Sequence, residues 1–406
     1  MVEKKEPVLF YGDGPMCHTG FGVVAKHILN GLYDTGKYDI SCLGINFWGN
    51  PHDQNHLNCY PTNQDPRGRD RLETLLREIN PKILFTINDY DALTFVPDIL
   101  TRYKQETGNK VDWVAYIPVD GTPVYPEYVE MIKRYVDYPV LYTKFAVEEI
   151  KKTDPTLELP YVYHGVDLEL FKKLPKALRD KVRKQNGFEG KFVVLTAGVN
   201  QLRKQFQLVI QAFSEFAKDK EDVFLYMHTQ PNLRYGWNLM RLAKIFGIWS
   251  KVGFTKNLNL PVGIPFPDMV DVYNSADVYL GASCGEGFGL NYLEAAACGL
   301  PVIYHNATAL TELYKDVGFP IPTDHHFIFP LGDRDLIRPI PNVSDMVKAL
   351  ELFYGNRSLI KEYSNKSLAL VKKDCFKWDD AVKTFDDIFE KALTTETENL
   401  ELEEIL

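Results

Sequence analysis

Short apolar runs alternate with longer amphipathic stretches along most of this chain. Strands of a parallel sheet are buried on both faces, so they read as continuous apolar runs, and the amphipathic stretches between them predict covering helices. This alternation is typical of a doubly wound α/β domain. In the first half it predicts strands at Val8–Gly12, Ile40–Ile45, Ile83–Ile87, Trp113–Ile117, Val140–Tyr142 and Tyr161–Tyr163, and helices at Phe21–Tyr33, Arg71–Ile79, Pro126–Tyr135 and Phe145–Lys151.

The same alternation starts again after a basic and polar segment at Leu168–Gly190. It predicts strands at Phe192–Thr196, Val223–His228, Val252–Phe254, Val278–Leu280 and Val302–Tyr304, and helices at Phe206–Lys218, Leu239–Phe246 and Met269–Ser275. Two complete sets in tandem imply two Rossmann-like domains that face each other across a cleft. We expect the first domain at residues 1–168, a linker at 169–189, the second domain at 190–375, a helix at 376–394 and an acidic, loosely ordered tail at 395–406.

The composition is that of a globular protein with more than one domain. The chain has 406 residues, of which 45% are hydrophobic and 25% are charged. A net charge of −9 provides no general basic field that would hold polyanions, although a local basic groove is compatible with it. We interpret the basic run from Lys172 to Lys184 as a solvated helical face rather than a membrane or nucleic-acid patch.

Cysteine spacing and the N-terminal residues indicate the compartment. The six cysteines are scattered without a Cys-x-x-Cys pair, which suits a reducing cytoplasm and argues against structural zinc. The N-terminus has no apolar signal segment, and no apolar run approaches the length of about 18 residues that a membrane span needs. We therefore expect a cytoplasmic protein without a transmembrane segment.

The segment Ala282–Pro301 carries the most specific chemical signal. Glu286 lies in a glycine-rich turn between a strand and a helix, and Glu294 lies on that helix after seven intervening residues. Ligands of parallel sheets bind at the carboxyl ends of the strands, where the free amides of such a turn hold anions. Amides that bind phosphates lie here beside carboxylates that accept hydrogen bonds from diols. This combination predicts a sugar nucleotide as the ligand.

The run Glu-Gly-Phe-Gly-Leu-x3-Glu-Ala, followed by Gly-x-Pro-Val-Ile, resembles the E-x7-E signature of retaining glycosyltransferases with the GT-B fold, of the family 4 type. The resemblance implies that Glu286 contacts the donor sugar as a catalytic residue and that Glu294 binds the ribose hydroxyls. It implies a C-terminal helix that returns to the first domain. It also implies that the turn assists donor binding, at Gly287, Phe288, Gly289 and Leu290.

The resemblance also implies a diphosphate site in the second domain. Family members place an arginine and a lysine five positions apart, and these cations neutralise the charge of the leaving group without a metal. Lys204 occupies the lysine position, but Val199 stands where the arginine is expected. Arg203 is the candidate to replace that arginine. The alternatives are a donor that is held differently or an activity that is weak.

Two loops at predicted strand ends supply further candidates. In the loop after the first strand, the resemblance places Gly20 and Gly22 near the donor phosphates and His18 on the acceptor side. Thr308 lies in a loop that replaces a Gly-Gly pair usual in the family. Its amide or hydroxyl is expected to bind the diphosphate or the sugar.

Two aspartates follow strands of the first domain. Asp120 is expected at the catalytic centre, where it orients an acceptor hydroxyl, and Asp89 is expected on the acceptor side. Asp89-Tyr90-Asp91 also matches the Asp-x-Asp arrangement by which metal-dependent glycosyltransferases of another fold hold a divalent cation. Because the long match lies in the second half of the chain, we expect no metal.

The sequence as a whole predicts an enzyme that moves a hexose from a nucleotide-diphosphate sugar, UDP- or GDP-linked, to an acceptor hydroxyl. The resemblance implies retention, front-face displacement, and no metal or cofactor besides the donor. The acceptor stays open among a glycan, a lipid, a protein, a small molecule and a modified nucleic-acid base. Alternatives are a sugar phosphorylase or sugar-nucleotide epimerase on the same fold, or a non-catalytic protein that binds sugar nucleotides or glycans, which Val199 favours.

Overall fold

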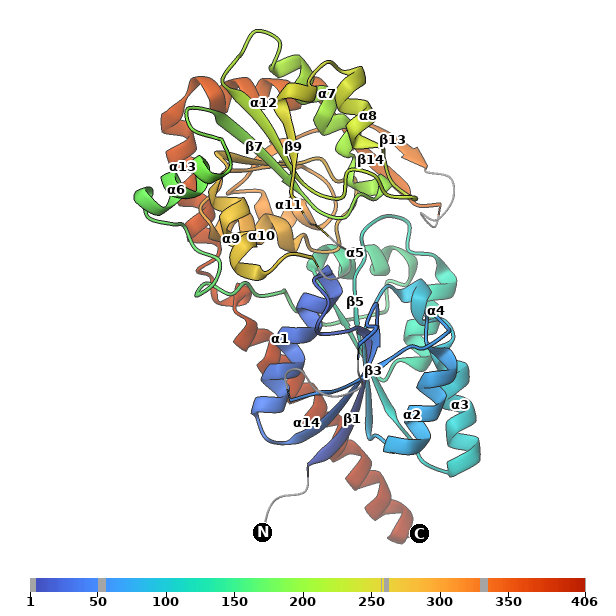
Figure 1. The fold of residues 1–406 in the computed structure, drawn as a ribbon. Helices are drawn as coiled ribbons and strands as arrows, with labels where there is room; N and C mark the ends of the chain where they lie inside the picture. Colours follow the sequence, from blue (N-terminus) through green and yellow to red (C-terminus); the bar gives the residue numbers. More distant parts are fainter. Residues whose placement is uncertain (1–4, 50–55, 257, 259–262, 329–334, 406) are drawn as a thin grey trace.

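Two parallel sheets, each of six strands and each covered by helices, form the two domains of the molecule (Figure 1). A computed structural model describes residues 5–49, 56–256, 258, 263–328 and 335–405, with side chains up to residue 394. Each sheet runs through the centre of its domain, and the long C-terminal helix descends beside the first domain (Figure 1).

The first domain contains β1 (Glu6–Asp13), β2 (Tyr38–Ile45), β3 (Asn58–Pro61), β4 (Ile83–Ile87), β5 (Asp112–Ile117) and β6 (Tyr138–Leu141). Its helices are α1 (Gly20–Asp34), α2 (Arg69–Ile79), the short η1 (Tyr90–Leu93), α3 (Val96–Thr107), α4 (Pro126–Tyr135) and α5 (Lys144–Thr153). The strand order is β3-β2-β1-β4-β5-β6, and every neighbouring pair is parallel.

The second domain contains β7 (Phe192–Ala197), β8 (Val223–His228), β9 (Val252–Phe254), β10 (Val278–Gly281), β11 (Val302–His305) and β12 (Phe319–Ile321), together with the hairpin of β13 (Thr323–Ile328) and β14 (Ile337–Pro341). Its helices are α6 (Lys176–Gln185), η2 (Leu202–Lys204), α7 (Phe206–Phe216), α8 (Leu239–Ile245), η3 (Trp249–Lys251), α9 (Phe266–Asn274), α10 (Leu290–Ala297), α11 (Ala309–Tyr314), α12 (Val343–Gly355) and α13 (Arg357–Leu370). The chain ends with η4 (Asp374–Phe376) and α14 (Trp378–Ile405).

The second sheet repeats the strand order of the first, as β12-β11-β10-β7-β8-β9. The order reverses direction beside β1 in one sheet and beside β7 in the other, and ligands of doubly wound folds bind at that point. The fold class predicted from the sequence, two Rossmann-like domains, is confirmed.

The C-terminal helix returns to the first domain, as predicted. Lys37 Nζ lies 2.6 Å from a carboxylate oxygen of Asp386, and the Tyr38 hydroxyl donates to the other oxygen at 2.6 Å. The rings of Phe385 and Phe389 pack against that of Phe85 of β4, the first tilted and the second edge to face. The backbone N–H of Val166 donates to the Phe376 carbonyl at 3.0 Å, so the two chain segments that cross between the domains are bonded to each other.

Two predicted elements differ from the structure, and several observed elements were not predicted. The segment Tyr161–Tyr163 makes only a single bridge to Leu141, because Pro160 cannot donate to a longer ladder. Strand β3 and helix α3 were not predicted from the sequence pattern. Helix α14 continues to Ile405 where a loosely ordered tail was expected, since no glycine or proline interrupts the sequence there.

The linker contains α6, and its basic run is not wholly solvated as expected. Arg183 is buried, its guanidinium lies 3.2 Å from Asp277 Oδ2, and it donates to the Ser275 carbonyl at 2.6 Å. Asp277 also accepts from the Val193 amide at 2.9 Å. These bonds attach α6 to the start of β7 and β10, so this part of the linker belongs structurally to the second domain.

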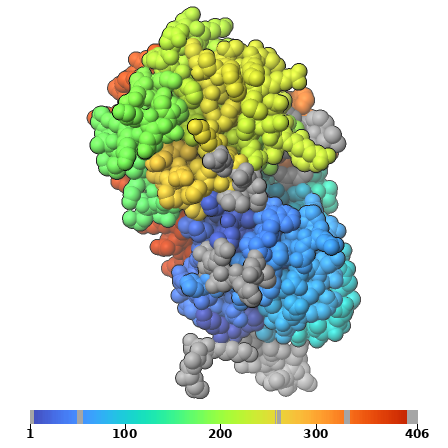
Figure 2. Space-filling view, in the orientation of Figure 1, coloured from blue at the N-terminus to red at the C-terminus, as the bar shows by residue number. Residues whose placement is uncertain are grey.

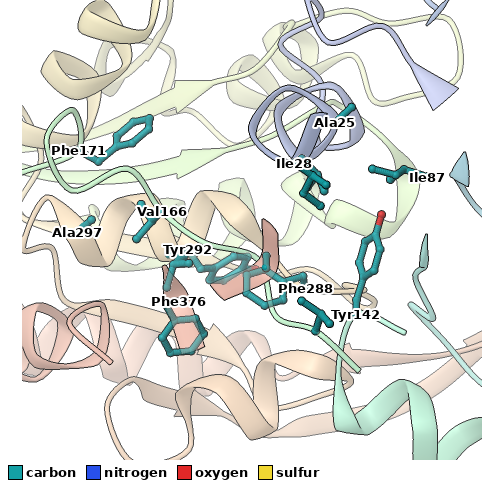
Figure 3. Close-up of a cluster of buried hydrophobic side chains, with 14 of the residues drawn as sticks. Ala25, Ile28, Ile87, Tyr142, Val166, Phe171, Phe288, Tyr292, Ala297 and Phe376 are labelled. Atoms are coloured by element: carbon teal, nitrogen blue, oxygen red, sulfur yellow. The ribbon is translucent and has the colours of Figure 1, made fainter. Parts of the chain in front are cut away.

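One buried apolar cluster extends across both domains (Figure 3). Ile28 and Ile87 of the first domain, Val166 of the crossing segment and Tyr292 of α10 are members of it. Figure 3 shows Phe288 between Tyr292 and Tyr142, at the boundary of the two domains. The apolar contact at this boundary removes surface from water and favours a docked arrangement of the domains.

In the part of the chain that the structure describes, no helix combines the length and the apolar character required to cross a membrane. None of the six cysteines, all of which lie within the described ranges, is in a disulfide.

Arg183→Met should lower the free energy of unfolding by about 2–3 kcal/mol, because it leaves the Ser275 and Lys191 carbonyls without their donor and Asp277 with Arg179 as its remaining ion-pair partner among the described residues. Urea denaturation followed by circular dichroism measures the change. Lys181→Met, on the exposed face of the same helix, is the matched control and should change stability by less than about 0.5 kcal/mol. Equal effects of the two substitutions would contradict the structural role of Arg183.

Candidate functional site

A cavity of about 1070 Å³ lies between the domains, at the carboxyl ends of both sheets. The first domain contributes residues that follow β1, β2, β4 and β5, and the second contributes residues that follow β7, β8 and β10. Most sequence-predicted site residues line it: His18, Gly20, Asp89, Asp120, Arg203, Lys204, Glu286, Gly287, Phe288, Gly289, Leu290 and Glu294. The exceptions are Gly22 and Thr308.

Glu286 is the centre of the charged wall of this cavity. Its side chain is buried and is ion-paired with Lys204 through one oxygen and with Arg203 Nη1 through the other, at 3.1 Å. Burial alone would raise the pKa of Glu286, but the charges of Lys204 and Arg203 outweigh burial and hold the pKa below its ordinary value. Glu286 is therefore a carboxylate at neutral pH.

Asp120 extends this set of charges into the first domain. One of its oxygens lies 3.6 Å from Arg203 Nε, and the other lies 3.4 Å from Nη2 of Arg338. Arg338 is fully buried and also donates to the Asp120 carbonyl. Lys204, Glu286, Arg203, Asp120 and Arg338 thus alternate in sign, and we call them the ion chain.

Arg338 belongs to the β13–β14 hairpin, which joins the second domain to the first. The backbone N–H of Ile337 donates to the Thr122 carbonyl at 2.8 Å, and the Tyr125 hydroxyl donates to the Asp335 carbonyl at 3.2 Å. These bonds and the Arg338–Asp120 pair fasten the hairpin to the loop that follows β5. We call this contact the hairpin clasp.

Glu294 lies on the second turn of α10 and faces the same cavity. Its Oε2 accepts from the Tyr273 hydroxyl at 2.7 Å, and no other hydrogen bond to this carboxyl is found among the described residues. Burial raises the pKa of Glu294 to about 7, against the opposing effect of the Tyr273 hydrogen bond. The two glutamates therefore differ: Glu286 is neutralised by cations, whereas Glu294 titrates near neutral pH.

The turn around Glu286 contains glycines because neighbouring atoms occupy the space that a side chain would need. A Cβ at Gly285 would collide with Arg338 Nη1 and the Asp120 carbonyl, and a Cβ at Gly287 would lie 2.8 Å from Cβ of Pro118. Gly289 has φ +95°, which allows α10 to begin directly after it. The Phe288 ring lies 4.4 Å from the His164 ring, so this side chain anchors the turn in the apolar cluster.

Of the two glycines predicted as site residues in the loop after β1, one lines the cavity and the other does not. Gly20 lines the cavity with open space beside its Cα, whereas a Cβ at Gly22 would collide with the Cys17 carbonyl. Gly22 therefore lets α1 begin close to its own loop and does not reach the cavity wall. His18 Nδ1 lies 2.8 Å from the Ile264 backbone oxygen of the second domain, and its ring centre lies 4.6 Å from that of Phe266.

Since Ile264 offers a carbonyl there, Nδ1 of His18 is the donor in that bond. On the same side of the cavity, Asp13 accepts from the Thr19 hydroxyl and from Asn46 Nδ2, the latter at 3.0 Å. Burial raises the pKa of Asp13, while the Thr19 and Asn46 hydrogen bonds oppose that shift.

Asp89 and Asp91 both line the cavity beyond β4. Within the described ranges, no group of three or more His, Cys, Asp or Glu side chains is arranged to hold a metal ion. The expectation that Asp89 contacts an acceptor stays a prediction.

Thr308 and Arg203, both of the second domain, were predicted to bind the donor, and the structure shows which protein groups each of them contacts. Thr308 is behind the cavity wall, where its hydroxyl accepts from the Glu286 amide at 3.1 Å and so positions the turn. Val199 lines the cavity, and Arg203 lies beside it with its guanidinium engaged by Glu286, Asp120 and the Gly285 carbonyl. Whether Arg203 replaces the expected arginine stays a prediction.

Sequence reasoning missed Arg338, Asp13 and Tyr273. Arg338 is a single cation inside the apolar, proline-bounded run Ile337–Pro341, and a charge in such a run indicates a buried partner. Asp13 stands at the end of the first strand, a position that also marks it as a site candidate. No local signal identifies Tyr273.

The comparisons with protein families agree on the second domain. Residues 179–324 match the family described as Glycosyl transferases group 1, and residues 266–385 match Family 4 Glycosyltransferase in conflict systems. The mannosylfructose-phosphate synthase of Agrobacterium fabrum is 29% identical over 216 residues, which are 50% of this chain and 43% of that protein. The chain thus spans less than half the length of this relative.

Solved structures resemble the chain over nearly its whole length. Sucrose-phosphate synthase from Thermosynechococcus elongatus has a TM-score of 0.75 at 13% identity, covering 96% of this chain and 100% of that one. HepE from Anabaena in complex with UDP-glucose has a TM-score of 0.72 at 14% identity, covering 95% and 99%. At these identities the likeness shows the fold alone.

Arg338→Met should loosen the hairpin clasp, because it removes the cation that pairs with Asp120 across the clasp. We expect the Ile337 amide, which donates across the clasp, to exchange with solvent about a hundredfold faster or more. Hydrogen exchange with mass spectrometry measures this, and α12 should keep its protection. Arg134→Met, at an exposed arginine, is the control. Unchanged exchange at Ile337 would show that the ion pair does not hold the clasp.

Proposed function

We propose, from the group 1, family 4-like glycosyltransferase domain that this chain carries on a GT-B fold, that it transfers a hexose from a nucleotide-diphosphate sugar to an acceptor hydroxyl. The matches of residues 179–324 and 266–385 to glycosyltransferase families support the family 4 resemblance of the E-x7-E motif. The observation that carries the proposed activity is the position of Glu286 and Glu294, which face one interdomain cavity from the same turn and helix.

The donor lies on the second domain in this proposal. Glu294 accepts from the ribose hydroxyls, and Glu286 accepts from hydroxyls of the hexose. Lys204 and Arg203 face the diphosphate, and the amides at the start of α10 add donors. The position of Lys204 and Arg203 on the cavity wall supports this placement, because these two cations of the second domain attract a diphosphate.

The reaction proposed is a retaining, front-face displacement that requires no metal and no cofactor besides the donor. Lys204 and Arg203 stabilise the negative charge that develops on the leaving phosphate. The leaving phosphate takes the proton of the acceptor hydroxyl, and Asp120, which is fixed by two arginines, orients that hydroxyl. The acceptor lies toward the first domain, near His18 and Asp89.

The donor nucleotide is proposed to be UDP or GDP. UDP-sugars are the first to test, since HepE, which shares this fold, was solved with UDP-glucose. The acceptor class extends over glycans, lipids, proteins, small molecules and modified bases. A cytoplasmic location is proposed as well, in keeping with six cysteines that form no disulfide.

A non-catalytic sugar-nucleotide-binding protein is the second candidate. Val199 in place of the expected arginine favours it, because one phosphate-binding cation is then absent from its usual position. Calorimetric binding of a donor without transfer or hydrolysis would select this candidate. Phosphate-dependent release of a sugar phosphate, or an altered donor sugar without acceptor, would select a phosphorylase or an epimerase instead.

Glu286→Gln and Lys204→Ala should each lower kcat/KM for transfer by about a hundredfold or more, since each removes charge that stabilises the transition state. The donor is first identified by the rise in Tm with a panel of UDP-, GDP- and ADP-sugars. Transfer is then followed by NMR, which should show the anomeric configuration of the donor in the product. Glu215→Gln, exposed on α7, is the control. Wild-type turnover in either site variant would refute the proposed activity.

Donor affinity should rise with pH through the pKa of Glu294. Below about pH 7 the carboxyl is protonated and accepts poorly from the ribose, so Kd should rise about tenfold for each unit of acidification. Above about pH 8 the affinity should level off. Calorimetry with an intact nucleotide sugar measures this, because a free nucleotide has a terminal phosphate that titrates near pH 6. Glu294→Gln should bind weakly with no such dependence, and a persisting dependence would assign the titration elsewhere.

A further inference from the structure

Residues 223–267 contain no aspartate or glutamate but five lysines and arginines, in a chain whose net charge is −9. This stretch forms β8, α8, η3 and β9, at one edge of the second sheet. Figure 2 shows it, in yellow-green to yellow, spread over the near face of the upper domain. Acidic residues are common elsewhere in the chain, so this edge has a charge opposite to that of the whole.

Four of the five cations project into solvent: Arg234, Arg241, Lys244 and Lys256. None of the four forms an ion pair with any residue that the structure describes. The fifth, Lys251, is committed to the fold, since its ammonium donates to the carbonyls of Ala217 and Lys220 at 3.0 and 2.6 Å. The exposed cations are thus available to an anionic partner.

Large apolar side chains lie among these cations. Ile245 is 67% exposed and Trp249 is 46% exposed, and Met240 and Phe246 are also exposed. The Lys244 ammonium lies 5.1 Å from the centre of the Trp249 ring, in a cation–π contact on the surface. We call this surface the basic-apolar face; it consists of Met240, Arg241, Lys244, Ile245, Phe246 and Trp249.

Helical geometry explains why these residues share a surface. Leu239 and Ala243 are buried against the domain, and the positions that follow each of them, Met240 and Lys244, lie one turn apart on the outside. The Asn238 side chain accepts from the Arg241 amide at 3.0 Å and fixes the start of the helix. The exposure of this face is therefore a consequence of the native helix and not of a frayed end.

We propose that the basic-apolar face binds the surface of an anionic lipid bilayer. Lysine and arginine side chains are attracted to anionic headgroups, while apolar side chains enter the boundary between headgroups and acyl chains. The two aliphatic members, Met240 and Ile245, favour lipid over single-stranded nucleic acid, whose bases bind by stacking on aromatic rings. The two cations of the face, Arg241 and Lys244, suit a reversible contact rather than a permanent one.

The face adjoins the opening of the interdomain cavity. Tyr235 is 76% exposed and lines that cavity, only a few residues before α8. The loop that carries it is rigidly held, because Asn200 Nδ2 donates to the Gln230 and Trp237 carbonyls at 3.0 and 2.7 Å. A chain seated on a bilayer through this face would therefore hold the cavity opening close to the headgroups.

Co-sedimentation of the full chain with vesicles tests the proposal. We expect binding to equimolar phosphatidylcholine–phosphatidylglycerol vesicles, much weaker binding to phosphatidylcholine alone, and loss of binding as sodium chloride is raised. Arg241→Gln with Lys244→Gln should lower the partition coefficient about fivefold for each cation removed. Ile245→Ser with Trp249→Ser should weaken binding at every salt concentration. Lys361→Gln with Lys372→Gln, which removes equal charge from exposed positions outside the face, should leave binding unchanged.

Three results would overturn the proposal. They are equal binding to neutral and anionic vesicles, equal loss in the face variant and the control variant, and no vesicle binding at low salt. Fluorescence anisotropy with a labelled single-stranded oligonucleotide is run in parallel. Oligonucleotide binding that the face variants abolish, without vesicle binding, would assign the face to nucleic acid instead. None of these readouts depends on transfer activity, so they stand apart from the proposed enzymatic function.

Discussion

Two carboxylates that are withdrawn from water must be compensated by cations, and this requirement organises the whole interdomain region. Glu286 and Asp120 are both buried, and each is bonded to two cations, with Arg203 shared between them. An uncompensated buried carboxylate is strongly destabilising, so the donor turn, η2, the hairpin and the loop after β5 are placed together. The same compensation keeps Glu286 ionised, whereas Glu294, with only a tyrosine hydroxyl, titrates near neutral pH.

The fold was predictable from the sequence because its strands are buried on both faces. Runs such as Ile83–Ile87 and Phe192–Thr196 are apolar at nearly every position and coincide with β4 and β7. Helix α3 escaped prediction because its apolar residues are sparse and a proline stands in its first turn. The basic run in the linker did not indicate that Arg183 is buried, because its partner Asp277 is remote in the sequence and only folding brings the two together.

The candidate site was predictable only where its residues are close in sequence. Glu286 and Glu294 belong to one turn and helix, so their spacing alone placed them at one edge of the sheet. Arg338 and Asp120 are 218 positions apart, and no periodicity connects them. Gly22 was predicted to bind the donor because it lies close to Gly20 in the sequence. The structure gives another reason for a glycine there, since the Cys17 carbonyl occupies the space of a side chain.

The bond between Val166 and Phe376 means that the polypeptide passes between the domains twice at one place. A single proteolytic cut in residues 168–175 would divide the chain into two polypeptides, and α14, which belongs to the second of them, would hold the two together through its noncovalent contacts with the first domain. Packing of this returning helix thus replaces the covalent connection after such a cut, which a fold with a lone connector and no returning helix does not allow.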